Sequence, residues 1–179
     1  MDGFFKVDIK GYTAYLPILE IAKDLKIAFF NLHGATDMTE HCGKELAKLC
    51  DGCEVVITAE SKGLQLAHVV ARERGMEYYA VARKSKKLYM QDGIFVEYGS
   101  SITTGQKQCL YLSKHDVDLI KGKKVAIVDD VVSTGESLKG LENLVIKAGG
   151  IIQKKLFVLA EGQAKNRKDV EYLASIPLL

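Results

Sequence analysis

Two adjacent carboxylates, Asp129 and Asp130, are the residues whose type and position most clearly indicate chemistry. They follow four apolar residues, 125–128, with the composition of a buried strand, and they precede the turn Ser133-Thr134-Gly135.

Ligands of open α/β sheets bind outside the carboxyl ends of strands. A hydroxyl-rich turn that opens a helix offers backbone N–H groups and the positive end of the helix dipole to a phosphate. Carboxylates suit sugar hydroxyls because they only accept hydrogen bonds. The stretch predicts a site for a phosphorylated sugar, spaced like ribose 5-phosphate, rather than a solvent-facing helix cap.

Two further stretches favour anion binding. Residues 58–63, Thr-Ala-Glu-Ser-Lys-Gly, run from a strand end through a small-residue loop into a helix, which presents backbone donors. Residues 83–87, Arg-Lys-Ser-Lys-Lys, hold four cations in five positions and suit a highly charged anion. Each stretch alone is equally typical of an ordinary loop, so their weight comes from occurring together with the two acids.

Together these stretches resemble the type I phosphoribosyltransferases. Residues 125–137 are similar to the family's phosphoribosyl pyrophosphate motif, with Glu136 in place of its second glycine and Ser137 in place of its final threonine. Ser137 keeps a hydroxyl, whereas Glu136 must point away from the phosphate. Residues 58–63 resemble the pyrophosphate loop of adenine phosphoribosyltransferases, with Lys62 in place of an arginine that offers a bidentate fork. The resemblance runs from about residue 27 to the end.

The resemblance implies a set of site residues. Those expected at the 5′-phosphate are Ser133, Thr134, Gly135, Glu136 and Ser137, and those expected at the pyrophosphate are Glu60, Ser61, Lys62, Arg83, Lys84 and Lys87. Asp129 and Asp130 are expected to act in catalysis and to hold Mg²⁺ through water. Glu97 is a further catalytic candidate, because Glu97-Tyr98-Gly99 spells a tripeptide that carries a catalytic glutamate in some adenine enzymes.

The base site is expected in the segment that this family places over the purine. Phe29, Phe30 and Asn31 occupy it here, although burial in the core explains either ring equally well. The later stretch 98–112 also resembles bacterial xanthine phosphoribosyltransferases.

The implied reaction is displacement of pyrophosphate from C1 of phosphoribosyl pyrophosphate by a nucleobase nitrogen, which gives a nucleoside 5′-monophosphate. The resemblance puts adenine ahead of xanthine, guanine or hypoxanthine as the base. The segment from Lys84 to Thr104 is expected to close over the site, and its part from about Lys87 to Thr104 is expected to be the most mobile region of the unliganded protein. Two alternatives are a regulator that senses phosphoribosyl pyrophosphate without catalysis and an orotate enzyme, for which the purine-type loops are the wrong match.

The elements that must position these residues follow from periodicity. The order of strands and helices predicts an α/β fold, and the resemblance implies the type I phosphoribosyltransferase fold, a mostly parallel central sheet flanked by helices with a small N-terminal hood. Residues 4–21 are β-rich, with a turn at Lys10-Gly11 and with Pro17 ending the second strand or confining it to an edge. The expected helices are 39–49, with Thr39 as N-cap, 63–74 and 137–148. The expected strands are 54–59, 78–82, 108–112, 125–128 and 151–160.

Length and composition limit the number of domains, the kinds of partner and the location of the protein. The 179 residues, 47% of them hydrophobic, suit one domain, divided into a hood at 1–35, a core at 36–160 and a C-terminal hood-side segment at 161–179. The net charge of +2 argues against nucleic acid as a partner. We expect no membrane segment, no signal peptide and a cytoplasmic location.

Four cysteines and a group of apolar residues complete the expectations. Cys50 and Cys53 have the spacing of a zinc or redox pair, but without a second pair we expect reduced thiols near a helix end. A homodimer is implied by the resemblance. More apolar side chains occur than one helix face and one strand can bury, namely Leu64, Leu66, Val69, Val70, Tyr78 and Tyr79.

Overall fold

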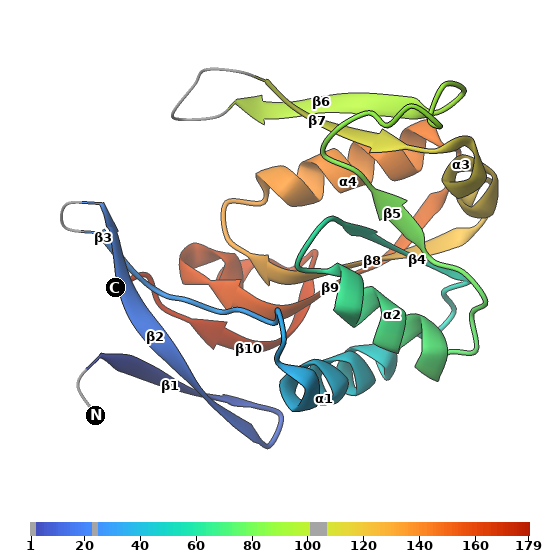
Figure 1. Cartoon of the computed structure of the whole chain (residues 1–179). Coiled ribbons are helices and arrows are strands. Elements are labelled where there is room, and N and C mark those ends of the chain that lie inside the picture. The colour runs from blue at the N-terminus through green and yellow to red at the C-terminus, as the bar shows by residue number, and fades with distance from the viewer. Residues whose placement is uncertain (1–2, 23–24, 101–106) are drawn as a thin grey trace.

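A computed structural model describes residues 3–22, 25–100 and 107–179, and its centre is a five-stranded sheet (Figure 1). The strand order is β10-β9-β8-β4-β5, and every neighbouring pair is parallel. The strands are β4 (Val55–Ala59), β5 (Ala80–Ala82), β8 (Lys124–Val132), β9 (Ile151–Glu161) and β10 (Glu171–Ile176). The predicted α/β class with a mostly parallel sheet is therefore confirmed.

Helices cover both faces of this sheet because the strand side chains alternate. α1 (Thr36–Ala47) and α2 (Leu64–Glu73) pack on the face that presents Val56, Ala126 and Val128. α4 (Glu136–Lys147) and α3 (Lys114–Ile120) pack on the opposite face, which presents the alternate strand residues, Val55, Ile57, Val125 and Ile127. The sheet is therefore packed between two hydrophobic cores, one on each face, and these cores hold in place the strand β8, which carries Asp129 and Asp130.

The hood is a separate antiparallel sheet. Its strands are β1 (Phe4–Ile9), β2 (Tyr12–Ala22) and β3 (Leu25–Ala28), in the order β1-β2-β3. The predicted turn at Lys10-Gly11 is confirmed: both residues have positive φ, and the Gly11 N–H donates to Asp8 Oδ1 at 3.1 Å.

The prediction for Pro17 is wrong, because β2 is the central strand of the hood and continues through it. Pro17 lies where β2 leaves β1, opposite Phe4, and begins to pair with β3. The Pro17 carbonyl accepts from the Phe29 N–H at 2.9 Å. The missing N–H of proline is tolerated at this change of partner, where the sequence alone suggests a strand end.

A hairpin of β6 (Ile94–Ser100) and β7 (Lys107–Leu112) lies on α4. The Tyr98 ring leaves no room for a side chain at Gly140 of α4, where a Cβ would come within 2.8 Å of it. Lys147 Nζ donates to the Phe95 carbonyl at 2.8 Å. β6 falls within the predicted closing segment and β7 follows that segment, whose end, residues 101–104, lies outside the described residues.

The chain ends by joining core and hood. After the 3₁₀ helix η1 (Gly162–Asn166), β10 adds to the edge of the sheet, and Leu178 then forms an antiparallel bridge with Ile27 of β3. The Leu178 side chain also fills the space above Gly162. Residues at the C-terminus therefore hold the hood against the core.

One predicted helix feature needs correction, and one helix is additional to those predicted. The first helix begins at Thr36, so Thr39 is not its N-cap but a buried residue inside it, with Oγ1 3.5 Å from the Leu32 carbonyl. α3 was not predicted, although Ser113 and Asp116 form a capping box that is readable in the sequence. Its seven residues are too few to show a helical period.

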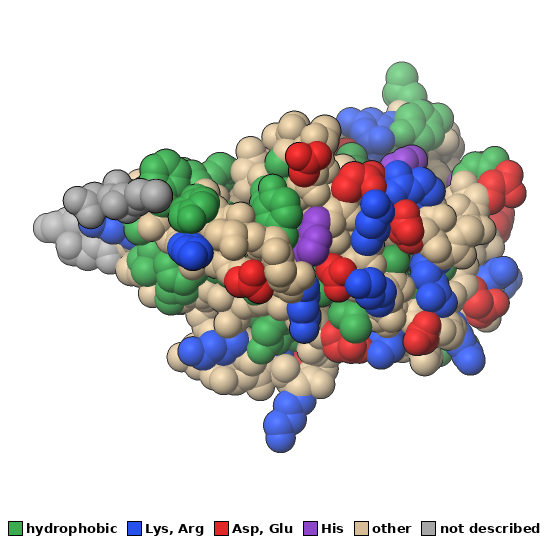
Figure 2. All heavy atoms as spheres, turned by 90° about the horizontal axis from the view of Figure 1, so that it is seen from below, with side chains coloured by type: hydrophobic (Ala, Val, Ile, Leu, Met, Phe, Trp, Pro, Cys, Tyr) green, Lys and Arg blue, Asp and Glu red, His purple; other side chains and the backbone are tan. Residues whose placement is uncertain are grey.

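The face that carries α1 and α2 mixes both signs of charge (Figure 2). Arg72 of α2 forms hydrogen bonds of 3.0 and 2.7 Å to Glu40 of α1 and thereby joins the two helices. No helix among the described residues is long and apolar enough to cross a membrane.

The cysteines are free thiols. Cys42 and Cys50 are buried, and the Cys50 and Cys53 thiols are hydrogen-bonded to each other just after α1. The described residues contain no cluster of three side chains able to hold a metal ion.

Candidate functional site

The candidate site lies at the carboxyl edge of the sheet, where β4 and β8 run side by side and in parallel. The loop after β4 contains Glu60–Gly63, which we call the pyrophosphate loop. The turn after β8 contains Ser133–Ser137, which we call the 5′-phosphate loop. The structure thus brings together the two loops that the sequence places 70 residues apart.

The two acids lie between these loops. Asp130 is 8% exposed, and its Oδ2 is buried without a hydrogen-bond partner. Lys62 Nζ lies 3.6 Å from that oxygen. Asp129 Oδ1 accepts from the Asp130 N–H at 2.9 Å. Burial first, and then repulsion from Asp130, raise the pKa of Asp129 to about 7. This edge therefore presents oxygen acceptors to a ligand that can supply hydroxyl donors or a cation.

Gly63 lets the pyrophosphate loop reach the acids. A Cβ at this position would lie 2.0 Å from Thr58 Oγ1 and 2.8 Å from Asp129 Oδ1. The end of the loop therefore packs directly on the carboxylate, and a larger residue would push the two apart.

Glu60 organises the basic segment that follows β5. Its carboxylate pairs with Arg83 Nε at 2.7 Å and accepts from the Lys84 N–H at 2.6 Å. Arg83 and Lys84 are therefore brought to the pyrophosphate loop. Lys87, by contrast, donates to Ser85 Oγ within its own turn, at 2.8 Å. The Ser61 hydroxyl lies 3.4 Å from His33 Nε2, a contact with the hood-side segment that the sequence did not indicate.

The 5′-phosphate loop surrounds a cavity of about 120 Å³. Gly135 has φ +86° and forms the N-cap of α4, where no side chain caps the helix. The cavity is lined by Asp129, Phe157 and the whole loop, and its volume equals about four water molecules at roughly 30 Å³ each. Backbone donors at a helix N-terminus surround a space suited to a phosphate.

Glu136 and Tyr98 connect this loop with the hairpin. The Glu136 carboxylate lies against Gly99 of β6, with Oε2 2.7 Å from the position that a Cβ would take. The Tyr98 hydroxyl is hydrogen-bonded to the Ser137 side chain, and burial raises the pKa of Tyr98. Tyr98 belongs to the tripeptide Glu97-Tyr98-Gly99, in which the sequence alone indicated only Glu97 as a candidate. Adjacent residues of a strand point to opposite faces, so Tyr98 and Glu97 have different surroundings. Tyr98 is buried against α4, whereas its neighbour Glu97 is exposed, and the catalytic role of Glu97 stays a prediction.

The hood supplies a second cavity, of about 480 Å³, lined by residues that include Tyr12, Pro17, Phe29, Asn31 and Met38. Phe30 is 3% exposed and belongs to the core. Phe29 remains partly exposed, and Lys62 Nζ lies 5.4 Å from its ring centroid. Lys62 therefore contacts both the hood ring and Asp130.

Comparisons with known proteins agree with this geometry. The family model described as phosphoribosyl transferase domain matches residues 16–176. A xanthine phosphoribosyltransferase of Bacillus thuringiensis (strain Al Hakam) is 32% identical over 163 residues, covering 85% of this chain and 80% of that protein.

Solved structures share the fold. Adenine phosphoribosyltransferase from Thermoanaerobacter pseudethanolicus superposes with a TM-score of 0.69 at 22% identity, covering 84% of this chain and 89% of that one. The enzyme from Trypanosoma brucei, solved with AMP, pyrophosphate and ribose-5-phosphate, gives a TM-score of 0.62 at 14% identity and covers 82% and 66% of the two chains.

Proposed function

The chain belongs to the phosphoribosyltransferase family, and from this premise we propose that it transfers the phosphoribosyl group from phosphoribosyl pyrophosphate to a purine base. The observation that carries the proposal is the pair of anion loops on either side of Asp129 and Asp130 at one sheet edge. A phosphoribosyl pyrophosphate molecule has a phosphate at one end, a pyrophosphate at the other and two ribose hydroxyls between them, in the same order.

Different groups of the chain bind the different parts of phosphoribosyl pyrophosphate. The backbone N–H groups of the 5′-phosphate loop bind the phosphate, and Asp129 and Asp130 accept from the ribose hydroxyls. Lys62, Arg83 and Lys84 bring positive charge to the departing pyrophosphate. Because the ribosyl centre becomes oxocarbenium-like as the bond breaks, such charge stabilisation matters more than a strong nucleophile.

Mg²⁺ fits this donor set. The unpartnered, buried Oδ2 of Asp130 and the neighbouring Asp129 are oxygen ligands of the kind that Mg²⁺ prefers, and one or two carboxylates plus substrate phosphates usually suffice. When bound, the ion would neutralise charge on the pyrophosphate as it leaves.

We propose an oxopurine as the base, with xanthine first, which reverses the order expected from the sequence. Asn31 Oδ1 accepts from the His33 N–H at 3.1 Å, so the Asn31 side chain offers the cavity its NH₂ donor. Lys62 is a second donor beside Phe29. Two donors match the carbonyl oxygens of an oxopurine better than the amino group of adenine. The 32% identity with a xanthine enzyme supports the same order.

The deciding experiment is pyrophosphate release from phosphoribosyl pyrophosphate and Mg²⁺ with xanthine, guanine, hypoxanthine, adenine and orotate. We expect the highest kcat/KM with xanthine. Asn31→Asp turns the donor into an acceptor and should lower kcat/KM for xanthine at least about tenfold while sparing adenine. Met38→Leu, in the same cavity, is the matched control. Binding of phosphoribosyl pyrophosphate without turnover of any base would instead identify a regulator.

We also propose a homodimer in the cytoplasm. The free thiols of the described cysteines fit a reducing compartment. The apolar argument for a dimer needs correction, because Leu66, Val69 and Val70 are buried within the subunit. Tyr78 remains 52% exposed. Sedimentation equilibrium at micromolar concentration tests this proposal, and a single species with the mass of one chain would contradict it.

A further inference from the structure

We propose that Arg167 is a positioning residue of the 5′-phosphate loop, whose guanidinium fixes Gly135 and adds positive charge where the phosphate of the phosphoribosyl group binds. The proposal rests on the proposed function only in taking a phosphoribosyl compound as the ligand. Arg167 follows η1, 32 residues beyond Gly135, and neither the motif nor its spacing includes it.

The contact with Gly135 is direct. Arg167 Nη1 lies 2.2 Å from the position that a Cβ of Gly135 would take. Any other residue at this N-cap would collide with the guanidinium and would also have to adopt the positive φ of +86°. The glycine therefore admits both the turn and the arginine.

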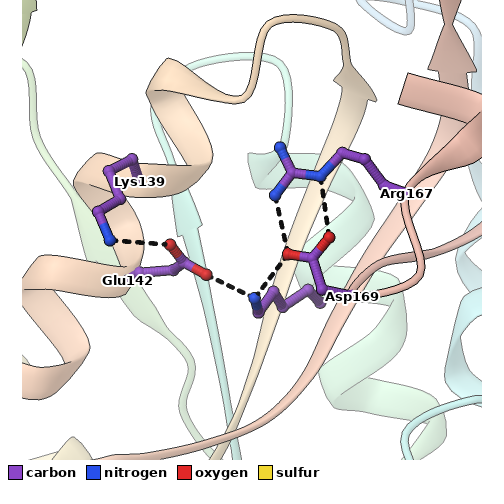
Figure 3. Close-up of polar contacts among 5 residues, drawn as sticks. Lys139, Glu142, Arg167 and Asp169 are labelled. Atoms are coloured by element: carbon purple, nitrogen blue, oxygen red, sulfur yellow. Dashed lines mark hydrogen bonds and ion pairs between the residues drawn. The ribbon is translucent and has the colours of Figure 1, made fainter. Parts of the chain in front are cut away.

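Asp169 orients the guanidinium. Arg167 Nε donates to Asp169 Oδ1 at 3.0 Å, and Nη2 donates to Oδ2 at 2.8 Å. Figure 3 shows this fork, with the third nitrogen pointing away from Asp169. Because Nε and Nη2 are bonded to Asp169, Nη1 is the guanidinium nitrogen that faces the loop.

A chain of charges continues from Asp169 to the helix that the loop opens. Lys155 Nζ lies 3.0 Å from Asp169 and 2.5 Å from Glu142 of α4, and Glu142 in turn lies 3.8 Å from Lys139 (Figure 3). The Lys155 and Glu142 side chains are only 19% and 15% exposed. Hydrogen bonds from Arg167 and Lys155 hold the pKa of Asp169 well below its usual range. The network ties Arg167 to α4 at neutral pH.

The sign of the charge points to an anion. A cation beside a helix N-terminus is unfavourable by itself, because that end already carries partial positive charge. The network itself holds three cations, Lys139, Lys155 and Arg167, against two carboxylates, and the Glu136 carboxylate in the first turn of α4 lies against Gly99 of β6. A bound phosphate would benefit from the helix end and from the guanidinium together.

The test measures binding of ribose 5-phosphate and, separately, of pyrophosphate to the whole protein by calorimetry. Arg167→Gln should weaken ribose 5-phosphate binding about tenfold and leave pyrophosphate binding within about twofold. Arg74→Gln is the matched control, because Arg74 also pairs with an aspartate, Asp51 at 3.3 Å, and its side chain is 32% exposed against 30% for Arg167. Equal ribose 5-phosphate affinity in the two glutamine variants would overturn the proposal.

Arg167→Lys is the second variant and is informative even if the glutamine protein does not fold. It keeps the charge but loses the fork, so ribose 5-phosphate should bind about threefold more weakly than to the unmodified chain. Unchanged affinity in the lysine variant, or an equal loss for pyrophosphate, would overturn the proposal. Turnover by the unmodified chain tests the proposed function separately, because a failure of catalysis leaves these binding ratios measurable.

Discussion

The two anion loops reach the same pair of acids by different means. In the pyrophosphate loop, side chains make the contacts: Glu60 holds Arg83 and the Lys84 N–H, and Lys62 reaches Asp130. The 5′-phosphate loop is built from backbone donors around a cavity and is supported from outside by Arg167.

The two loops illustrate two ways in which a protein recognises an anion, with charged side chains or with backbone N–H groups. A phosphate monoester is compact and is matched by fixed N–H groups at a helix end, which do not depend on the side chain at each position. A magnesium-bound pyrophosphate that must leave is matched by cations on longer side chains. We therefore expect the loss of a charged side chain within the loop to affect the pyrophosphate loop, whereas the 5′-phosphate loop depends on the positions of its backbone N–H groups, which Gly135 and Arg167 support.

The largest effect should come from the acids that both loops share. Asp130→Asn should lower kcat/KM about ten- to a hundredfold, since a charge-assisted hydrogen bond is worth roughly 1.5–3 kcal/mol. Asp129→Asn should have a similar effect. Steady-state kinetics with circular dichroism measures activity and folding together, and near-normal kinetics in both variants would contradict the shared role.

Replacing one glycine of each loop with alanine tests how well each loop tolerates an added methyl group. Gly63→Ala would clash with the buried Thr58 hydroxyl at 2.0 Å, which has little room to move, whereas Gly135→Ala would clash with the end of the flexible Arg167 side chain. Gly63→Ala should therefore weaken pyrophosphate binding about tenfold and lower the Tm. Gly135→Ala should destabilise the chain by about 1 kcal/mol because of its positive φ and weaken ribose 5-phosphate binding. A milder effect at Gly63 than at Gly135 would reverse the comparison.

Removing one charge from the pyrophosphate loop tests its dependence on side chains. Glu60→Gln breaks the pair with Arg83 and should weaken pyrophosphate binding about three- to fivefold, with ribose 5-phosphate binding unchanged. The control is Glu171→Gln, which breaks a 2.6 Å pair with Lys154 on the far side of the sheet. Similar losses for both ligands would mean that Glu60 supports the fold and not one loop.

The last predicted effect is on stability and not on ligand binding, and it depends on pH. Burial and Asp130 raise the pKa of Asp129 from 3.8 to about 7, so the neutral form is favoured in the folded chain. Asp129 therefore stabilises the fold below about pH 4, and that contribution is lost as pH rises through about 7. Asp129→Asn should remove the dependence and raise the Tm at pH 8, relative to the parent chain, by about 2–4 °C for each 1 kcal/mol recovered. An identical loss of Tm between pH 5 and 8 in both proteins would contradict the raised pKa.

Local patterns accounted for much of this arrangement. Both loops and the turn at Lys10-Gly11 are encoded by consecutive residues, and the structure contains them. The strand predicted at 125–128 continues to Val132, so Asp129 and Asp130 lie within β8 and not after it. What sequence reasoning missed depends on contacts between distant residues: Arg167 with Gly135, Tyr98 with Ser137 and His33 with Ser61. Pro17 misled for the same reason, because the change of strand partner that tolerates it is a property of the assembled hood.

The hood shares no ladder with the central sheet, and it is joined to the core by the packing of apolar side chains such as Val7, Ile9 and Leu16 and by the bridge between Ile27 and Leu178. Because no hood strand pairs with a strand of the central sheet, we expect substitutions at exposed positions of β1, β2 and β3 to leave the register of β8, which carries the acids, unchanged. We therefore expect that substitutions lining the hood cavity, at residues such as Phe29 and Asn31, can change the preferred base while the binding of the sugar phosphate stays intact.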